Sequence, residues 1–227
     1  SQEARLFDFK WYAALAYIRA NRLNHNVLQG PNDRFGLIAS GKAYNDTRQA
    51  LLDLGLNDET CRRIGIRLHK VTVVWPLEAQ ATREFATGLQ EILVVEEKRQ
   101  VIEYQLKEEL YNWRDDVRPN ILGKFNEAPG DRSGGEWSMP NPSSHELLRA
   151  NADLSPAQIA RALAQAQGFG EAARVGGGDR GEAGQGVGVR QGLYIGGCVE
   201  RLDRDAIGCD PVQGLDIAAG GRLGCSL

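Results

Sequence analysis

The chain has 227 residues, of which 42% are hydrophobic and 25% are charged, so it is long enough for one well-buried domain with extensions or for two small domains. Its formal net charge of −3 argues against a general nucleic-acid binder. No apolar run approaches the ~20 residues that span a bilayer. We therefore expect neither nucleic acid nor a membrane among its partners.

Four cysteines stand at positions 61, 198, 209 and 225, and no two of them form a C-x-x-C pair. This spacing predicts neither a zinc site nor an iron–sulfur site, so no metal ligand is predicted. Scattered thiols fit a reducing compartment, and residues 1–8 lack the layout of a signal peptide. The predicted location is the cytoplasm.

Hydrophobic periodicity predicts four segments in chain order. Residues 1–30 are a helical connector whose helix, at 10–22, carries Trp11, Leu15 and Ile18 on one face. Residues 31–125 alternate strands with helices. Residues 126–167 are a loop followed by a helix that begins at Ser155-Pro156, and residues 168–227 form a tail. Within 31–125 the predicted strands are 34–41, 68–74, 92–95 and 119–125, and the predicted helices are 44–54, 81–89 and 102–113.

Three repeats of strand–helix alternation predict an α/β fold, a parallel sheet with flanking helices. The tail differs from the rest: it holds 17 of the 27 glycines, three of the four cysteines and no lysine. A segment with so little apolar surface is expected to be disordered. Gly176–Gly181 matches G-x-G-x-x-G, but neither a buried strand before it nor a helix after it supplies the context that a nucleotide-binding motif needs.

One candidate site lies where the first strand of the sheet meets its helix. Ser40, Gly41 and Lys42 place backbone N–H groups and a lysine at a predicted helix N-terminus, which suits an anion such as phosphate or carboxylate. The alternative is a tight βα turn with a solvated lysine. The P-loop pattern is absent.

A second candidate is the charged cluster Glu96-Glu97-Lys98-Arg99, which follows the third strand of the sheet. Charges at the carboxyl edge of a sheet can hold a cation, accept backbone hydrogen bonds or pair with a neighbouring domain. They can also be the acidic start of a helix. We favour contact with a partner, because no histidine or serine lies nearby in sequence to build a reaction centre.

The remaining candidates are His25, His69 and His145. They lack metal-ligand spacing, and we interpret them as ordinary, hydrogen-bonded histidines. Nothing in the sequence indicates a nucleophile with its base, so we predict no catalytic residue.

Several blocks in order resemble the indolepyruvate ferredoxin oxidoreductases, a thiamine-diphosphate-dependent family of 2-oxoacid:ferredoxin oxidoreductases. The resemblance runs from about residue 4 to residue 166 and is carried by residues 35–44, 64–71, 74–77, 92–98, 135–138 and 154–159. It implies the domain of that family that resembles the transketolase C-terminal domain, which supports assembly. The whole enzyme, here called the parent enzyme, would convert aryl 2-oxoacids to acyl-CoA and reduce ferredoxin.

The resemblance also implies which parts lie elsewhere. The family holds thiamine diphosphate and magnesium with a G-D-G…N segment, but here Gly130-Asp131 and Gly178-Asp179 are each followed by arginine. Its iron–sulfur cysteines are missing from this chain too. We expect that this chain binds no cofactor itself and that its partners are other domains or subunits of the parent enzyme, which is expected to be a homo-oligomer and to meet ferredoxin.

The sequence leaves open the origin of the tail and the choice among functions. Arginine outnumbers lysine 21 to 6, which is typical of GC-rich coding DNA, so we hypothesise that residues 168–227 are out-of-frame sequence attached to a genuine fragment. The alternative functions are a stand-alone α/β interaction module that uses Glu96–Arg99, or a CoA or nucleotide binder that uses Ser40–Tyr44.

Overall fold

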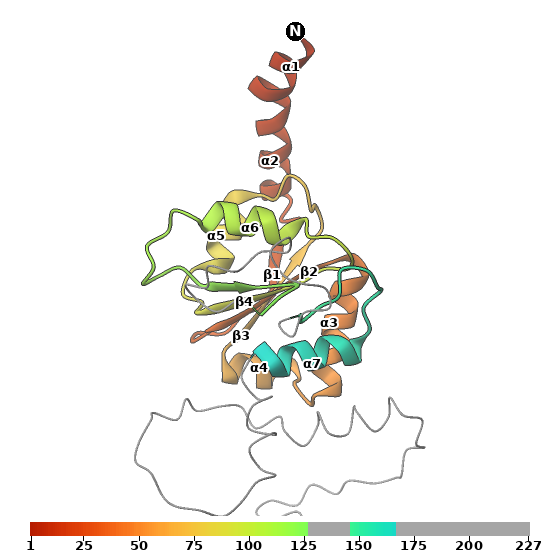
Figure 1. Ribbon diagram of the computed structural model, residues 1–227. Coiled ribbons are helices and arrows are strands. Elements are labelled where there is room, and N and C mark those ends of the chain that lie inside the picture. Colours follow the sequence, from red (N-terminus) through yellow and green to blue (C-terminus); the bar gives the residue numbers. More distant parts are fainter. Residues whose placement is uncertain (127–145, 167–227) are drawn as a thin grey trace, which may run out of the picture.

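A computed structural model describes residues 1–126 and 146–166, which form a five-stranded sheet with helices on both faces and a long helix that projects from it (Figure 1). The predictions for 127–145, including His145, and for the glycine-rich tail from 168 onward lie outside the described residues. The strands are β1 His25–Leu28, β2 Phe35–Ser40, β3 Ile66–Val71, β4 Glu91–Val95 and β5 Asn120–Leu122. The helices are α1 Gln2–Arg5, the π-helical turn η1 Leu6–Lys10, α2 Trp11–Ala20, α3 Gly41–Asp53, α4 Asp58–Ile64, α5 Ala79–Ala86, α6 Ile102–Leu110 and α7 Pro156–Ala166.

The strand order is β1-β3-β2-β4-β5. β2 pairs in parallel with both β3 and β4, and β4 pairs in parallel with β5. The central strands are apolar on both faces, since Leu37 and Ile38 of β2 and Leu93 and Val94 of β4 are all buried. Such runs are typical of a parallel sheet that helices cover on both sides, and the predicted fold class is confirmed.

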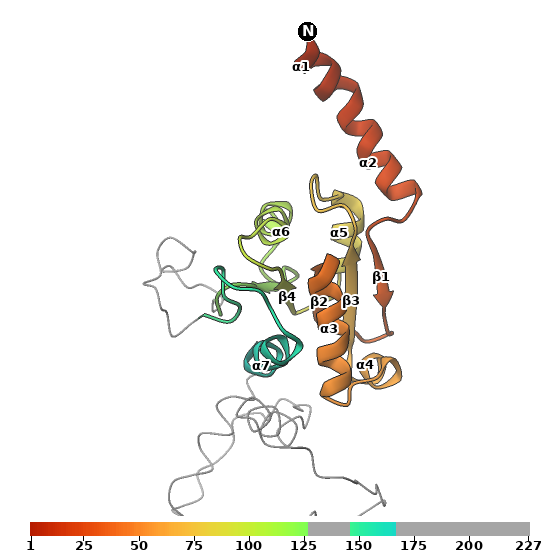
Figure 2. The same cartoon turned by 90° about the vertical axis from the view of Figure 1, so that its right-hand side faces the viewer.

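The helices divide between the two faces of the sheet (Figures 1 and 2). α3, α4 and α7 pack on the side of Leu37, Leu68 and Leu93. α5 and α6 pack on the side of Ile38 and Ile92. The chain moves outward from β2 to β3 and then crosses back to β4, so right-handed crossovers require helices on both faces.

α1 and η1 extend the predicted helix at 10–22 toward the N-terminus, and β1 and α4 were not predicted. β1 lies at the edge and runs antiparallel to β3, so the sheet is not parallel throughout. Its sequence, His-Asn-Val-Leu, lacks the alternation that marks a half-buried strand. α4 is only seven residues long and begins where the Asn57 side chain accepts a hydrogen bond from the backbone N–H of Thr60 at 2.9 Å. It ends at Gly65, whose φ of 87° is left-handed.

Boundaries moved by more than one residue in two of the predicted strands. β3 begins two residues before the predicted Leu68 and ends at Val71. It ends there because the backbone N–H groups of Thr72 and Val73 donate to Oδ1 of Asn24, at 2.9 and 3.0 Å, and leave the ladder of the sheet. β5 covers only Asn120–Leu122 of the predicted 119–125.

Candidate functional site

The two predicted candidate sites lie side by side at the carboxyl edge of the sheet. β2 and β4 are hydrogen-bonded neighbours with Ala39 opposite Val95, so Ser40 and Glu96 follow directly at the same edge. Ser40 has extended backbone and precedes α3, and Gly41 begins that helix with a φ of 53°. The sequence therefore placed both groups correctly, although it did not show that they contact each other.

Lys42 joins three parts of the fold through its ammonium group. Nζ donates to Oδ2 of Asp46 at 2.5 Å, to Oε1 of Glu97 at 2.9 Å and to the backbone carbonyl of Leu154 at 2.8 Å. The hydrogen bonds to Asp46 and Glu97 raise the pKa of Lys42, and the bond from Lys42 lowers the pKa of Glu97. We call Lys42, Asp46, Glu97 and Leu154 the α7 clamp, because Leu154 leads directly into α7.

The clamp bears on the predicted anion site at Ser40, Gly41 and Lys42. An ammonium group has three N–H donors, and three acceptors within the protein engage them. An incoming anion would have to displace a carboxylate from Lys42. Anion binding stays a prediction, and the observed contacts favour a structural role for this lysine.

Glu96 is turned inward, and its side chain caps the N-terminus of α6. Its carboxylate accepts hydrogen bonds from the backbone N–H groups of Ile102 at 2.7 Å, Glu103 at 2.9 Å and Val101 at 3.1 Å. Burial raises the pKa of this carboxyl group, although the same hydrogen bonds act in the opposite direction. The charged cluster was predicted to hold a cation, to accept backbone hydrogen bonds or to pair with a neighbouring domain. Glu96 accepts backbone hydrogen bonds.

Two buried charged residues complete this edge and were missed in the sequence. The ammonium group of Lys124 donates to the backbone carbonyl of Glu96, and its backbone N–H donates to Oε2 of Glu103 at 3.2 Å. Lys107 pairs with the other oxygen of Glu103 at 2.9 Å. A lysine near the end of the predicted strand at 119–125 was the only available signal, and solvated surface lysines share it.

The outer half of the charged cluster faces solvent. Lys98 and Arg99 are exposed, and Nζ of Lys98 lies 3.9 Å from Oδ1 of Asp153, which is also exposed. Contact between this edge and a partner stays a prediction, for which Lys98 and Arg99 are the most exposed residues of the cluster.

His69 departs from the interpretation of an ordinary, satisfied histidine. It is buried on β3, its Nδ1 lies 2.7 Å from Oδ1 of Asn26, and its ring packs against Phe85 with centroids 4.8 Å apart. Burial lowers its pKa to about 3. Its Nε2 is buried without a hydrogen-bond partner, as is Nδ1 of His25, and both residues line a polar hollow of about 320 Å³ between β1, β3 and α5.

Metal chemistry has little support in the part of the chain that the structure describes. No group of three histidine, cysteine, aspartate or glutamate side chains in 1–126 and 146–166 is arranged to hold a metal ion. Cys61, the one cysteine in these ranges, is buried, and burial raises the pKa of its thiol to about 11. Thiolate, which binds iron or zinc, is therefore disfavoured at Cys61. No described helix is both long and apolar enough to cross a membrane.

The geometry defines a class of protein: a mostly parallel α/β domain whose polar groups at the carboxyl edge hold its own helices in place. Comparison with known proteins then gives the family. Residues 24–171 match the family described as "Indolepyruvate ferredoxin oxidoreductase middle domain". The chain belongs to this family, and the matched range includes every strand of the sheet.

Relatives of known name agree with this assignment. "Indolepyruvate oxidoreductase subunit IorA" of Pyrococcus horikoshii is 29% identical over 100 residues, which are 44% of this chain and 14% of that subunit. The subunit of the same name in Pyrococcus abyssi is 31% identical over 88 residues, 38% of this chain and 12% of that subunit. The match therefore spans about one seventh of the length of these relatives.

Two solved structures share similarity at low identity. A split-gene transketolase in an inactive β4 tetramer matches with a TM-score of 0.40 and 14% identity, over 63% of this chain and 40% of that chain. The 2-oxoglutarate:ferredoxin oxidoreductase of Magnetococcus marinus, with 2-oxoglutarate, coenzyme A and succinyl-CoA bound, matches with a TM-score of 0.36 and 12% identity, over 63% of this chain and 19% of that chain.

Proposed function

We propose that this chain is the middle domain of an indolepyruvate:ferredoxin oxidoreductase subunit and serves its assembly, without a catalytic centre of its own. The observation that carries the proposal is the family match over residues 24–171. The relatives are named as oxidoreductase subunits, which supports other domains and subunits as the partners of this domain. In the parent enzyme the reaction would be the oxidative decarboxylation of aryl 2-oxoacids to acyl-CoA, with reduction of ferredoxin.

The contacts at the carboxyl edge support an assembly role. In many open α/β sheets this edge holds the ligand. Here Lys42, Glu96 and Glu97 use their polar atoms to fix α6 and α7 to the sheet. Among the described side chains no three histidine, cysteine, aspartate or glutamate residues are grouped to hold a metal ion, and we assign magnesium, the iron–sulfur cluster and thiamine diphosphate to other parts of the parent enzyme.

Calorimetry tests whether thiamine diphosphate binds to this chain or to other parts of the subunit. The isolated 227-residue chain and the full-length subunit are each titrated with thiamine diphosphate in the presence of Mg²⁺. We expect saturable binding heat from the full-length subunit and none from the isolated chain. Saturable binding by the isolated chain, lost when Lys42 is replaced by methionine, would instead establish the anion site at Ser40–Lys42.

A further inference from the structure

The segment before β1 is one continuous helical rod of α1, η1 and α2, and it projects away from the sheet (Figures 1 and 2). The rod touches the domain through its last turns and through Trp11. Ile18 is its one buried side chain, and Arg19 pairs with Glu78 at 2.5 Å. Most of the rod is therefore held by its own backbone hydrogen bonds, whereas helices in proteins owe most of their stability to the packing of an apolar face.

The rod carries an unusual density of exposed apolar side chains. Phe7, Phe9, Tyr12 and Tyr17 are between 57% and 71% exposed, and Leu6 is 43% exposed. Trp11 packs edge-on against Trp75 in the loop after β3, with ring centroids 5.0 Å apart, and Trp75 is itself 62% exposed. Exposed clusters of this kind mark surfaces that another protein or a membrane covers.

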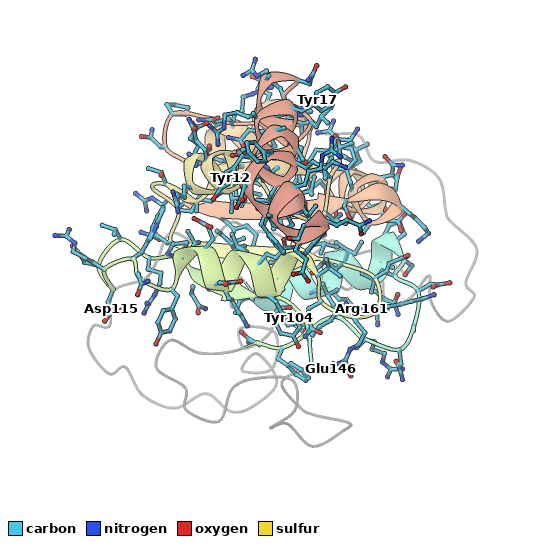
Figure 3. The ribbon with its side chains drawn as sticks, turned by 90° about the horizontal axis from the view of Figure 1, so that it is seen from above. Tyr12, Tyr17, Tyr104, Asp115, Glu146 and Arg161 are labelled. Carbon is cyan, nitrogen blue, oxygen red and sulfur yellow. The ribbon has the colours of Figure 1, made fainter. Side chains whose placement is uncertain are left out.

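These side chains surround the rod. At about 100° of rotation per residue, Tyr12 and Tyr17 stand roughly 140° apart. In Figure 3, Tyr12 and Tyr17 are labelled on different sides of the helix. Phe7 and Phe9 are two residues apart and so lie on nearly opposite sides. A helix that is hydrophobic on all sides is normally enclosed within a larger protein.

The distribution of apolar side chains around the rod distinguishes between the partners that could cover it: a second copy of the chain, a membrane or a surrounding protein. Pairing with a second copy of the rod would cover a single stripe and leave the other aromatic side chains in water. A helix lying on a membrane surface needs a strongly charged face, commonly rich in lysine or arginine, whereas residues 2–18 contain two acids and two bases, Glu3, Asp8, Arg5 and Lys10. An apolar groove in a surrounding protein fits the rod on every side.

The family match and the length of the relatives suggest which part of the protein would form that groove. The middle-domain match begins at residue 24, just beyond the rod, and the relatives are several times longer than the matched segment. We propose that the rod of residues 2–18 docks into an apolar groove formed by another part of the same oxidoreductase subunit and anchors the middle domain there. This inference rests on the proposed function.

Hydrogen exchange of intact proteins tests the inference. The isolated 227-residue chain, at several concentrations, is compared with the full-length subunit that contains the same segment. We expect backbone amides of residues 6–16 to exchange rapidly in the isolated chain at every concentration, and about 100-fold more slowly in the full-length subunit because docking removes local opening. Equally rapid exchange in both proteins would overturn the inference.

The other occupants give different outcomes, and each contradicts the proposal. Protection in the isolated chain that grows with its concentration would indicate a second copy. Protection of the isolated chain by phosphatidylglycerol vesicles alone would indicate a membrane. Aryl 2-oxoacid oxidation is measured on the same full-length preparation, so an inactive subunit with a protected rod would count against the proposed function and leave the docking intact.

Matched variants assign the protection to the aromatic side chains. In the full-length subunit, Phe9→Ser and Tyr12→Ser together should restore rapid exchange of residues 6–16. The same pair in the isolated chain controls for a direct effect on helix stability. Tyr111→Ser, at an aromatic residue that is 75% exposed after α6, should leave the rod protected. Unchanged protection in the Phe9→Ser/Tyr12→Ser protein would refute docking through these faces.

Discussion

Replacement of Glu96 by alanine removes the acceptor for three backbone N–H groups at the start of α6. Each of these hydrogen bonds contributes about 0.5–1.5 kcal/mol to stability, and a buried donor that stays unpaired costs about 1–3 kcal/mol. The alanine variant also avoids the cost of burying a carboxylate, a cost that shows in the raised pKa of Glu96. This gain offsets part of the loss from the three hydrogen bonds. We expect a net loss of about 2–4 kcal/mol in the free energy of unfolding.

Urea unfolding followed by tryptophan fluorescence measures this loss. With a slope of about 2 kcal/mol per molar urea, the Glu96→Ala midpoint should fall by roughly 1–2 M. Glu96→Gln keeps one acceptor oxygen and should lose about half as much. Glu97→Ala is the matched control next in sequence; its carboxylate is partly exposed, so the expected cost is below about 1 kcal/mol. A Glu96→Ala protein as stable as Glu97→Ala would refute the inward, capping role of Glu96.

Three further predictions follow from the buried groups. Arg67 pairs with Asp33 at 2.9 Å in the interior, so Arg67→Leu should cost about 3–5 kcal/mol in urea unfolding, and adding Asp33→Ala should recover part of that loss. Burial lowers the pKa of His69 to about 3, so as the pH falls this histidine takes up a proton in the unfolded chain before it does so in the folded chain. Stability should be full above pH ~6.5 and fall toward pH 3 by up to about 1.4 kcal/mol per pH unit, and His69→Gln should flatten this slope between pH 7 and 5. A side chain at Gly123 would meet Oε2 of Glu103 at 2.0 Å, so Gly123→Ala should lower stability by about 1–3 kcal/mol, and an unchanged midpoint of thermal unfolding would contradict this.

The parts of the fold that the sequence predicted are those with strong local signals. α3 is striped with buried Thr47 and Leu51 and ends beside Gly55, whose φ is 73°. α7 begins at Pro156, where the side chain of Ser155 accepts a hydrogen bond from the backbone N–H of Gln158 at 3.4 Å. β1 had no such signal, because its place in the sheet depends on pairing with residues of β3 that are 40 or more positions away in sequence.

The candidate site likewise has a part that the sequence predicted and a part that it did not. Strand ends put Ser40 and Glu96 at one edge, which follows from parallel pairing alone. The contacts of the neighbouring residues cannot be predicted from strand pairing. Lys42, for example, donates to the carbonyl of Leu154, which lies 112 residues later in the chain. Whether a charged residue after a strand faces inward depends on which helix covers it, so Glu96 and Lys124 look like solvated residues in the sequence.

The most direct test of the central claim is an anaerobic assay of indolepyruvate-dependent ferredoxin reduction with thiamine diphosphate, Mg²⁺ and CoA, run on the full-length enzyme and on the isolated 227-residue chain. We predict turnover by the full-length enzyme and none by the isolated chain. Turnover by the isolated chain would contradict its assignment as an assembly domain without a catalytic centre.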